Sequence, residues 1–156
     1  ALEELYGLTA FIKWPNDVIS DNGKLAGILI QTVDRHTIFG IGINTFDNLT
    51  CEAINQDVIG LTADNCHMES LDRRIDLMIE IVNSLAQSVE ELRDYGYPHF
   101  KPTVESRLAW KDKDVVISLE GHETVGKLQG TLDNGMLLLM TDEGESHHIS
   151  GTLRLK

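Results

Sequence analysis

The sequence predicts an α+β fold in which strands come first, one long helix follows and short strands return at the end. Apolar and β-branched residues between tight-turn signals fill residues 11–43, and apolar residues recur every three or four positions over 70–95. From residue 115 onward the period changes to two. With 156 residues and 42% hydrophobic content, the chain can hold one ordinary domain, or a truncated domain and a small one.

Charge and cysteine content exclude several functions. Acidic residues outnumber Lys and Arg by 25 to 13, and the net charge of -12 argues against non-specific binding to nucleic acid or to an anionic membrane. No apolar run approaches the roughly 20 residues that a membrane-spanning helix needs. Cys51 and Cys66 are not spaced like the ligands of a zinc site, and the sequence shows no secretory signal. We therefore expect reduced thiols in a cytoplasmic protein.

The first predicted element is the end of a helix. Residues 1–7 have the pattern of the last turns of an amphipathic helix that Gly7 closes. Because they carry no N-cap signal, we expect this helix to begin in a longer protein. Residues 11–14 then predict a short strand that enters a sheet, and Pro15 ends it because proline has no N–H to donate.

Three further segments predict an antiparallel meander. Asp21-Asn22-Gly23 is a strong tight-turn signal between a short strand at 18–20 and a longer one at 24–33. The apolar run of the longer strand predicts burial on both of its faces. A polar turn separates it from a further strand at 37–43.

The helix over residues 70–95 has the clearest pattern. Ser70 and Gly96 fit its N-cap and its C-terminal cap. Pro98 and Pro102 predict a linker after it, with domains at 1–101 and 102–156. An apolar stripe along the helix predicts packing against a core, and consists of Leu71, Ile75, Met78, Val82, Leu85, Val89 and Leu92.

Five short strands with tight turns are expected in the second domain. His147 and His148 lie in one of them, where alternation explains them better than ligand binding does. So many short strands in so little chain predict a small barrel of the SH3-like kind. The strands cover residues 115–119, 124–128, 136–140, 147–150 and 152–155.

Residues 45–69, which precede the long helix, give no clear prediction.

Lys24 is the first candidate for chemistry. It follows a tight turn and opens a strand, so we expect its ammonium at the end of the sheet, facing a cleft. There it could hold a phosphate and a carboxylate together and stabilise charge that develops on phosphorus. From the residues alone, Lys24 could also be an ordinary exposed lysine in a turn.

Lys13-Trp14-Pro15-Asn16-Asp17 supplies further candidates. Lys13 lies inside an apolar strand and needs an ionised partner, for which Asp17 is available. Lys13 and its partner could also form an ion pair whose role is purely structural. Asp17 could instead pair with Lys24 or help to hold Mg²⁺, and Asn16 could orient a ligand or the lysine.

Gly40-Ile41-Gly42-Ile43-Asn44 forms a third group. Its two glycines would let a flat ligand approach the backbone closely, although they also fit simple bulges in a strand. The amide of Asn44 matches the edge of adenine. No helix follows the glycines directly, so this is not a dinucleotide-binding fingerprint. Arg154, near the C-terminus, could reach a phosphate or be a surface cation.

The combination resembles the biotin protein ligases over nearly the whole chain. The most specific part is Lys-Trp-Pro-Asn-Asp, followed by Lys24-Leu25-Ala26-Gly27-Ile28-Leu29 and Gly-x-Gly-Ile-Asn. The resemblance implies part of a mixed-sheet catalytic domain of the class II synthetase or biotinyl/lipoyl ligase type, followed by the SH3-like barrel. It also implies an enzyme that joins biotin to ATP, giving biotinyl-5′-AMP and pyrophosphate, and then transfers biotin to a lysine of a carboxyl-carrier domain.

The resemblance implies a role for each candidate residue. Lys24 would contact the biotin carboxylate and the phosphate, and Asp17 and Lys13 would complete the catalytic set, with Asp17 near Mg²⁺. The substrate-binding residues would also include Asn16 at the phosphates, Gly27 and Gly40 against biotin, Gly42 as a further biotin or adenylate contact, Asn44 at adenine and Arg154 on the nucleotide side.

Two departures from the family pattern stand out. Gln31 occupies a position where many members have glutamate, and we expect little consequence. The 156 residues contain no Gly-Arg-Gly-Arg loop, which closes over the adenylate in the family. Without this loop the chemistry loses binding energy and water exclusion, so we expect the polypeptide alone to be inactive or nearly so, although its parent is a ligase.

Two other functions are open from the sequence. One is a non-catalytic module, a natural half-protein that acts through its barrel and sheet edge, and the other is a lipoate-ligase-like acyl transferase. The expected partners are biotin, ATP with Mg²⁺ and a biotin carboxyl-carrier protein, with no tightly bound cofactor and no membrane. An exposed sheet edge favours a homodimer. Nucleic acid would be a partner only if a helix-turn-helix precedes this chain.

Overall fold

The chain folds into two compact units. The computed structural model describes residues 2–21, 23–45 and 70–156. The first unit contains Ala1–Phe11 and Asn16–Ala86, and the second contains Ile12–Pro15 and Gln87–Lys156. Each includes an antiparallel sheet and helical residues, so the predicted α+β class is confirmed. The division into domains at 1–101 and 102–156 stays a prediction, because compact units need not coincide with domains.

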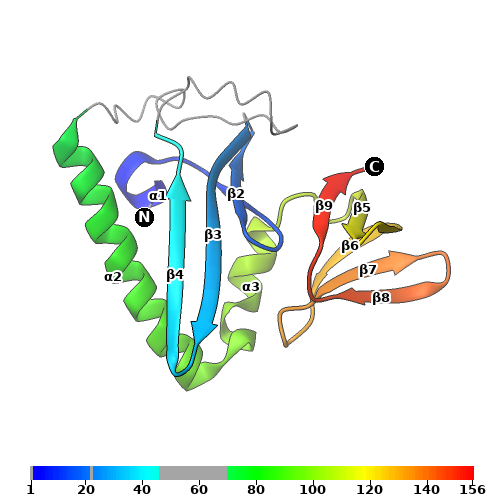
Figure 1. Cartoon of the computed structure of the whole chain (residues 1–156). Helices are drawn as coiled ribbons and strands as arrows, with labels where there is room; N and C mark the ends of the chain where they lie inside the picture. Colours follow the sequence, from blue (N-terminus) through cyan, green and yellow to red (C-terminus); the bar gives the residue numbers. More distant parts are fainter. Residues whose placement is uncertain (1, 22, 46–69) are drawn as a thin grey trace. The chain divides into compact units, whose positions relative to one another are not determined.

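The four predicted strands of the first sheet are all present. Their spatial order is β1-β2-β3-β4. The neighbouring pairs β2–β3 and β3–β4 are antiparallel, as a meander requires, and Figure 1 shows these three strands side by side. Gly7 closes the first helix, since its φ is 64° and its N–H donates to the Glu3 carbonyl over 2.8 Å. The elements are α1 (Leu2–Tyr6), β1 (Phe11–Lys13), β2 (Asp17–Ser20), β3 (Gly23–Val33), β4 (His36–Ile43) and α2 (Leu71–Tyr95).

The prediction that β3 is buried on both faces is wrong for its second half. Leu25 and Ala26 are buried, whereas Leu29, Ile30 and Val33 are each more than half exposed. The reason is the length of the strand. β2 pairs with β3 only as far as Gly27, so within the described residues the last part of β3 has β4 alone beside it.

The bounds of the long helix are confirmed, but the burial of its apolar stripe is not. Gly96 follows α2 with a φ of 72°, as expected of a C-terminal cap. Apart from the half-buried Leu85, every stripe residue is at least 39% exposed, and the buried residue of α2 is Leu77. Leu77 and its neighbour Ile81 pack with Leu25 and Ile43 of the sheet. Periodicity identified an apolar helix but could not show how little of it is covered by the described residues.

The predicted linker at Pro98 and Pro102 is wrong, because a helix, α3 (Tyr97–Arg107), occupies it. Pro98 lies in the first turn, where its missing N–H has no helical partner to lose. Pro102 removes a single hydrogen bond inside the helix. α3 makes polar contacts with the chain that follows it, since the Tyr97 hydroxyl lies 2.8 Å from Thr131 Oγ1 on β6 and Lys101 Nζ lies 2.8 Å from Asp133 in the turn after β6.

Glu105 makes a further connection between α3 and the sheet. Its Oε1 accepts a hydrogen bond from the Thr131 N–H over 3.1 Å, and its Oε2 lies 3.0 Å from Lys111 Nζ. Partial burial raises the pKa of this carboxyl, but the hydrogen bonds from Thr131 and Lys111 outweigh it and lower the pKa overall. The side chain is therefore held in its charged form.

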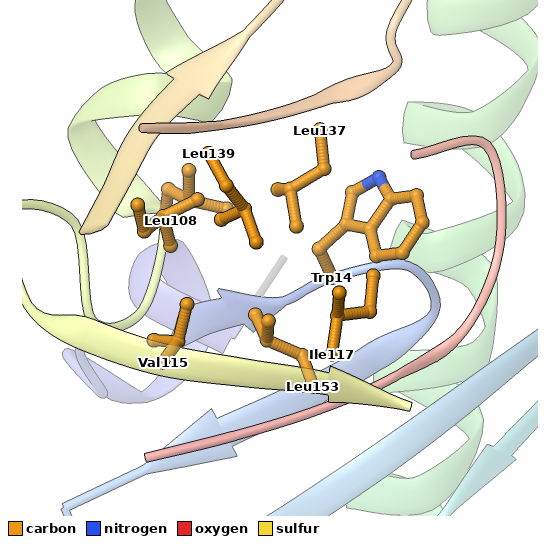
Figure 2. Close-up of a cluster of buried hydrophobic side chains, with 8 residues drawn as sticks. Trp14, Leu108, Val115, Ile117, Leu137, Leu139 and Leu153 are labelled. Carbon is orange, nitrogen blue, oxygen red and sulfur yellow. The ribbon is translucent and has the colours of Figure 1, made fainter. Parts of the chain in front are cut away.

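The five expected strands of the second sheet are present in the order β8-β7-β6-β5-β9, and each neighbouring pair is antiparallel. Figure 2 shows Trp14 among the leucine and valine side chains of their core, which also contains Leu108. Trp14 arrives there because the Ala109 N–H donates to the Ile12 carbonyl over 2.9 Å. The strands are β5 (Asp114–Leu119), β6 (His122–Thr131), β7 (Leu137–Thr141), β8 (Gly144–His148) and β9 (Thr152–Leu155).

Within the described ranges, none of the helices is long and apolar enough to cross a membrane.

Candidate functional site

The best candidate site surrounds Lys24, at the start of β3. Its Nζ lies 2.6 Å from Asp17 Oδ1, and the two side chains are 30% and 13% exposed. Such a distance is that of a charge-assisted hydrogen bond in a partly dehydrated ion pair. This is one of the two partners that the sequence allowed for Asp17. The largely buried carboxylate holds the ammonium, whose remaining protons can meet a ligand.

A β-bulge determines which way Lys24 points. Val18 pairs with Ala26 and Ile19 pairs with Lys24, so Leu25 is an extra residue in β3. Regular alternation would place Lys24 and Gly27 on opposite faces of the sheet. With the bulge they share a face, and a Cβ atom on Gly27 would lie 3.5 Å from Lys24 Nζ. Leu25 points the other way, into the cluster with Leu77.

A strip of bare backbone lies beside the ion pair. Asp17, Gly27 and Gly42 occupy one row across β2, β3 and β4. A Cβ on Gly42 would meet no described atom within 4 Å, and neither glycine has a positive φ. Packing and backbone geometry therefore do not require glycine at Gly42, whereas the close approach of a flat ligand would.

The sequence Gly40-x-Gly42 does not mark a bulge. β3 and β4 pair without any register shift from Ala26 and Ile43 to Val33 and His36. A Cβ on Gly40 would make only ordinary contact, at 3.7 Å from Leu29. The bulge that matters lies instead in β3 at Leu25, where no sequence pattern predicts one.

Asn44 follows β4 and contacts the backbone of β3 on either side of the bulge. Its Nδ2 donates to the Lys24 carbonyl over 2.9 Å, and its own N–H donates to the Leu25 carbonyl over 2.8 Å. Asn16 makes a backbone contact, in which its carbonyl accepts from the Ile28 N–H over 2.8 Å, while its side chain is exposed. The first unit thus brings Lys24, Asp17, Gly27, Gly42 and Asn44 together.

Lys13 and Arg154 belong to the second unit. Lys13 Nζ lies 5.8 Å from the centroid of the Trp110 ring, a cation–π geometry that the sequence analysis missed. Arg154 Nη2 lies 3.0 Å from Glu123 Oε1, with both side chains about half exposed. The hydrogen bond from Arg154 lowers the pKa of Glu123. Trp110 has a positive φ of 62°, and nothing in the sequence marked it as a partner of Lys13.

The described residues do not form a metal site of their own. No group of three or more His, Cys, Asp or Glu side chains among them is placed to hold an ion. Asp17 is the carboxylate of the cluster, and it is bonded to Lys24. These donors are too few to hold a resident Mg²⁺ by themselves, so the metal role of Asp17 stays a prediction. Cys51, Cys66 and His67 lie outside the described residues.

An apolar groove lies on the other face of the sheet. Ile41 and Ile43 of β4 line it together with Met78 and Val82 of α2. Because side chains alternate along β4, these isoleucines point away from the face that carries Gly40 and Gly42. The first sheet therefore has an apolar face toward α2 and a bare, charged face around Lys24.

Comparison with known proteins agrees with this fold. Residues 2–46 match the model of the biotin/lipoate A/B protein ligase family. The chain is 25% identical over 141 residues to the biotin–[acetyl-CoA-carboxylase] ligase of Paracoccus denitrificans, covering 85% of this chain and 58% of that protein. It is 28% identical over 166 aligned positions to the bifunctional ligase/repressor BirA of Bacillus subtilis strain 168, covering 99% of this chain and 49% of the relative.

Solved structures give the same answer. The biotin protein ligase from Aquifex aeolicus matches with a TM-score of 0.85 and 26% identity, covering 99% of this chain and 68% of that one. A structure of that ligase in complex with biotin and ATP matches with a TM-score of 0.85 and 27% identity, covering 99% and 66%.

The fold and the match of residues 2–46 thus support the class of biotin/lipoate protein ligases for this chain. Within this family the relatives and the structural neighbours support a biotin protein ligase, as the sequence resemblance implied. The chain spans about half the length of the curated relatives it matches.

Proposed function

We propose that this chain contributes half of the active site of a biotin protein ligase, which makes biotinyl-5′-AMP from biotin and ATP and passes biotin to a carrier lysine. The proposal rests on the position of the Lys24 ammonium. Asp17 holds it over Gly27, beside backbone that carries no side chain. Two anions must meet in the first step, and a fixed ammonium beside a flat surface suits that task. The structural neighbour that binds biotin and ATP supports both ligands.

The chemistry divides into two displacements. A carboxylate oxygen of biotin attacks the α-phosphorus of ATP, the bond to the β-phosphate breaks, and pyrophosphate leaves with the electron pair. The amine of the carrier lysine then attacks the acyl carbon and AMP leaves, while the amine loses a proton. Lys24 would reduce the repulsion between biotin and the phosphate and stabilise charge on the phosphoryl oxygens. Asp17 would keep its ammonium in position.

The other predicted residues have supporting parts in this proposal. Lys13 and Asn16 would contact the phosphates, and Arg154 would lie on the nucleotide side. Gly27, Gly40 and Gly42 would offer backbone to biotin and the adenylate, and Asn44 would meet adenine. Mg²⁺ would arrive with the nucleotide, whose phosphates supply oxygens that this cluster does not.

Several properties of the whole protein are part of the same proposal. The carrier would be a biotin carboxyl-carrier domain, and the setting would be cytoplasmic. The exposed outer edge of β4 would pair with a second copy to give a homodimer. The 156 residues without a Gly-Arg-Gly-Arg loop would form biotinyl-AMP slowly or not at all, which a single-turnover assay can measure; a rate equal to that of intact relatives would refute this.

Isothermal titration of the chain with a non-hydrolysable biotinyl-AMP mimic tests the proposal. We expect binding that Lys24→Ala abolishes and that the matched variant Lys127→Ala, at an exposed lysine on β6, leaves unchanged. Binding of the lipoyl analogue in place of the biotinyl mimic would favour the lipoate branch. If the folded chain binds neither, or binds them equally well with Lys24→Ala, the proposed site is wrong.

A further inference from the structure

The amide of Asn44 faces the backbone of the residue that carries the proposed chemistry. A carbonyl oxygen can only accept a hydrogen bond, so the 2.9 Å contact to the Lys24 carbonyl commits one hydrogen of the Asn44 amide group. The second hydrogen and Oδ1 make no further hydrogen bond to the described residues, so a ligand can use them. The Asn44 side chain can therefore bind a ligand and hold the Lys24 backbone at the same time.

The two hydrogen bonds of Asn44 bracket the bulge. Its side chain bonds to Lys24 and its N–H bonds to Leu25, which are the residues where β3 departs from regular pairing with β2. In a regular strand Lys24 would point to the face opposite Gly27. The direction of the lysine thus depends on an irregular backbone, and irregular backbone persists where its polar groups are satisfied.

From these contacts we infer that Asn44 is a positioning residue: it holds the bulge at Leu25 and so keeps the Lys24 ammonium over Gly27 and against Asp17. This inference rests on the proposed function for its catalytic meaning, but the geometry can be tested without any ligand. Removal of the amide leaves the Lys24 carbonyl without this donor, and a regular pairing becomes competitive with the bulge.

The test uses nuclear Overhauser contacts between the Lys24 ε-protons and the Gly27 α-protons, measured on the ligand-free chain. A Cβ on Gly27 would lie 3.5 Å from Lys24 Cε, so the wild type gives this contact. We expect Asn44→Asp and Asn44→Ala to lose it, and to bind the biotinyl-AMP mimic at least about tenfold more weakly. The matched control Asn83→Asp, at an exposed asparagine of α2, keeps both.

A different result would overturn the inference. If the Asn44 variants keep the Lys24–Gly27 contact and merely bind the mimic more weakly, Asn44 is a ligand contact and not a positioning residue. If the wild-type chain does not bind the mimic, the proposed function fails, while the Overhauser comparison still decides the role of Asn44.

A second measurement covers variants that do not fold. In the wild type, one Asn44 side-chain amide proton should exchange slowly with solvent and its nitrogen should show scalar coupling to the Lys24 carbonyl carbon. Rapid exchange of both side-chain protons, without that coupling, would also overturn the inference.

Discussion

The two units differ in how far each one buries its own apolar residues. The core of the second unit contains eight buried side chains. Three of them, Leu128, Leu137 and Leu139, are 0% exposed. Among the described residues, the corresponding cluster of the first unit has two, Leu25 and Leu77, and several large apolar side chains of α2 and β3 are exposed. The second unit thus has a closed apolar core of its own, whereas the first carries the candidate site on a sheet that its described residues cover incompletely.

This contrast predicts the largest effect for truncation of a core leucine in the second unit. Leu137→Ala should lower its free energy of unfolding by about 2–5 kcal/mol, because a cavity opens in a fully packed core. Both tryptophans, Trp14 and Trp110, belong to this unit, so their fluorescence during urea denaturation reports it selectively. The control Leu119→Ala, at a residue that is 43% exposed, should change little.

The same experiment with Leu25→Ala can break the comparison. If the units are stabilised separately, this variant shifts the circular dichroism transition of the first unit and leaves the tryptophan transition in place. An equal shift of both signals would show that the units unfold as one.

A smaller loss is expected where α3 approaches β6. Gly130 has a φ of 150°, and a Cβ there would lie 2.6 Å from Glu105 Oε1. Gly130→Ala should destabilise the second unit by about 1–3 kcal/mol, through backbone strain and displacement of that carboxylate. Gly121→Ala serves as control, because Gly121 also has a positive φ but has no described atom within 4 Å of a Cβ. A loss as large in the control would assign the whole effect to the backbone.

The pH dependence of the second unit should follow Glu105. Its pKa in the folded chain lies below the ordinary value of 4.5, so it contributes stability above that pH and loses it as pH falls through the folded pKa. Glu105→Gln should cost about 1 kcal/mol at pH 7 and little in strong acid. The melting temperatures of the variant and the wild type should therefore converge as pH falls through the folded pKa of Glu105. A constant difference would contradict this account.

The smallest change in stability is expected at the candidate site. Gly42→Ala should alter the free energy of unfolding by less than about 0.5 kcal/mol, since a Cβ there meets no described atom within 4 Å. It should nevertheless weaken binding of the biotinyl-AMP mimic, because the methyl group covers bare backbone. Titration calorimetry checks this, with Ile38→Ala on the same strand and face as control. Unchanged affinity would mean that the strip is not a ligand surface.

Local patterns were sufficient for most elements of the fold. All nine described strands lie within a few residues of segments that alternation and turn residues predicted. α3 was missed because two prolines were taken as helix breakers, although one of them lies in the first turn. The stripe of α2 shows the other limit: periodicity identifies an apolar face, but what covers that face depends on residues far away in the sequence.

The candidate site was predictable in composition and not in geometry. The sequence indicated that Lys24 might meet Asp17, since a tight turn joins their strands. It could not show that Leu25 is an extra residue, because a bulge depends on the register between two strands. It also could not show that Asn44 reaches the Lys24 carbonyl from 20 positions away.

The burial of Trp14 changes how variants in Lys-Trp-Pro-Asn-Asp should be interpreted. Its indole belongs to the core of the second unit, whereas Asp17 belongs to the first and holds Lys24. The sequence signature therefore divides between Pro15 and Asn16. The residues before this point belong to the second unit, and those after it belong to the first. In a saturation screen of this segment, defects at Trp14 would be rescued by lower temperature or by stabilising changes in the barrel, and defects at Asp17 would not.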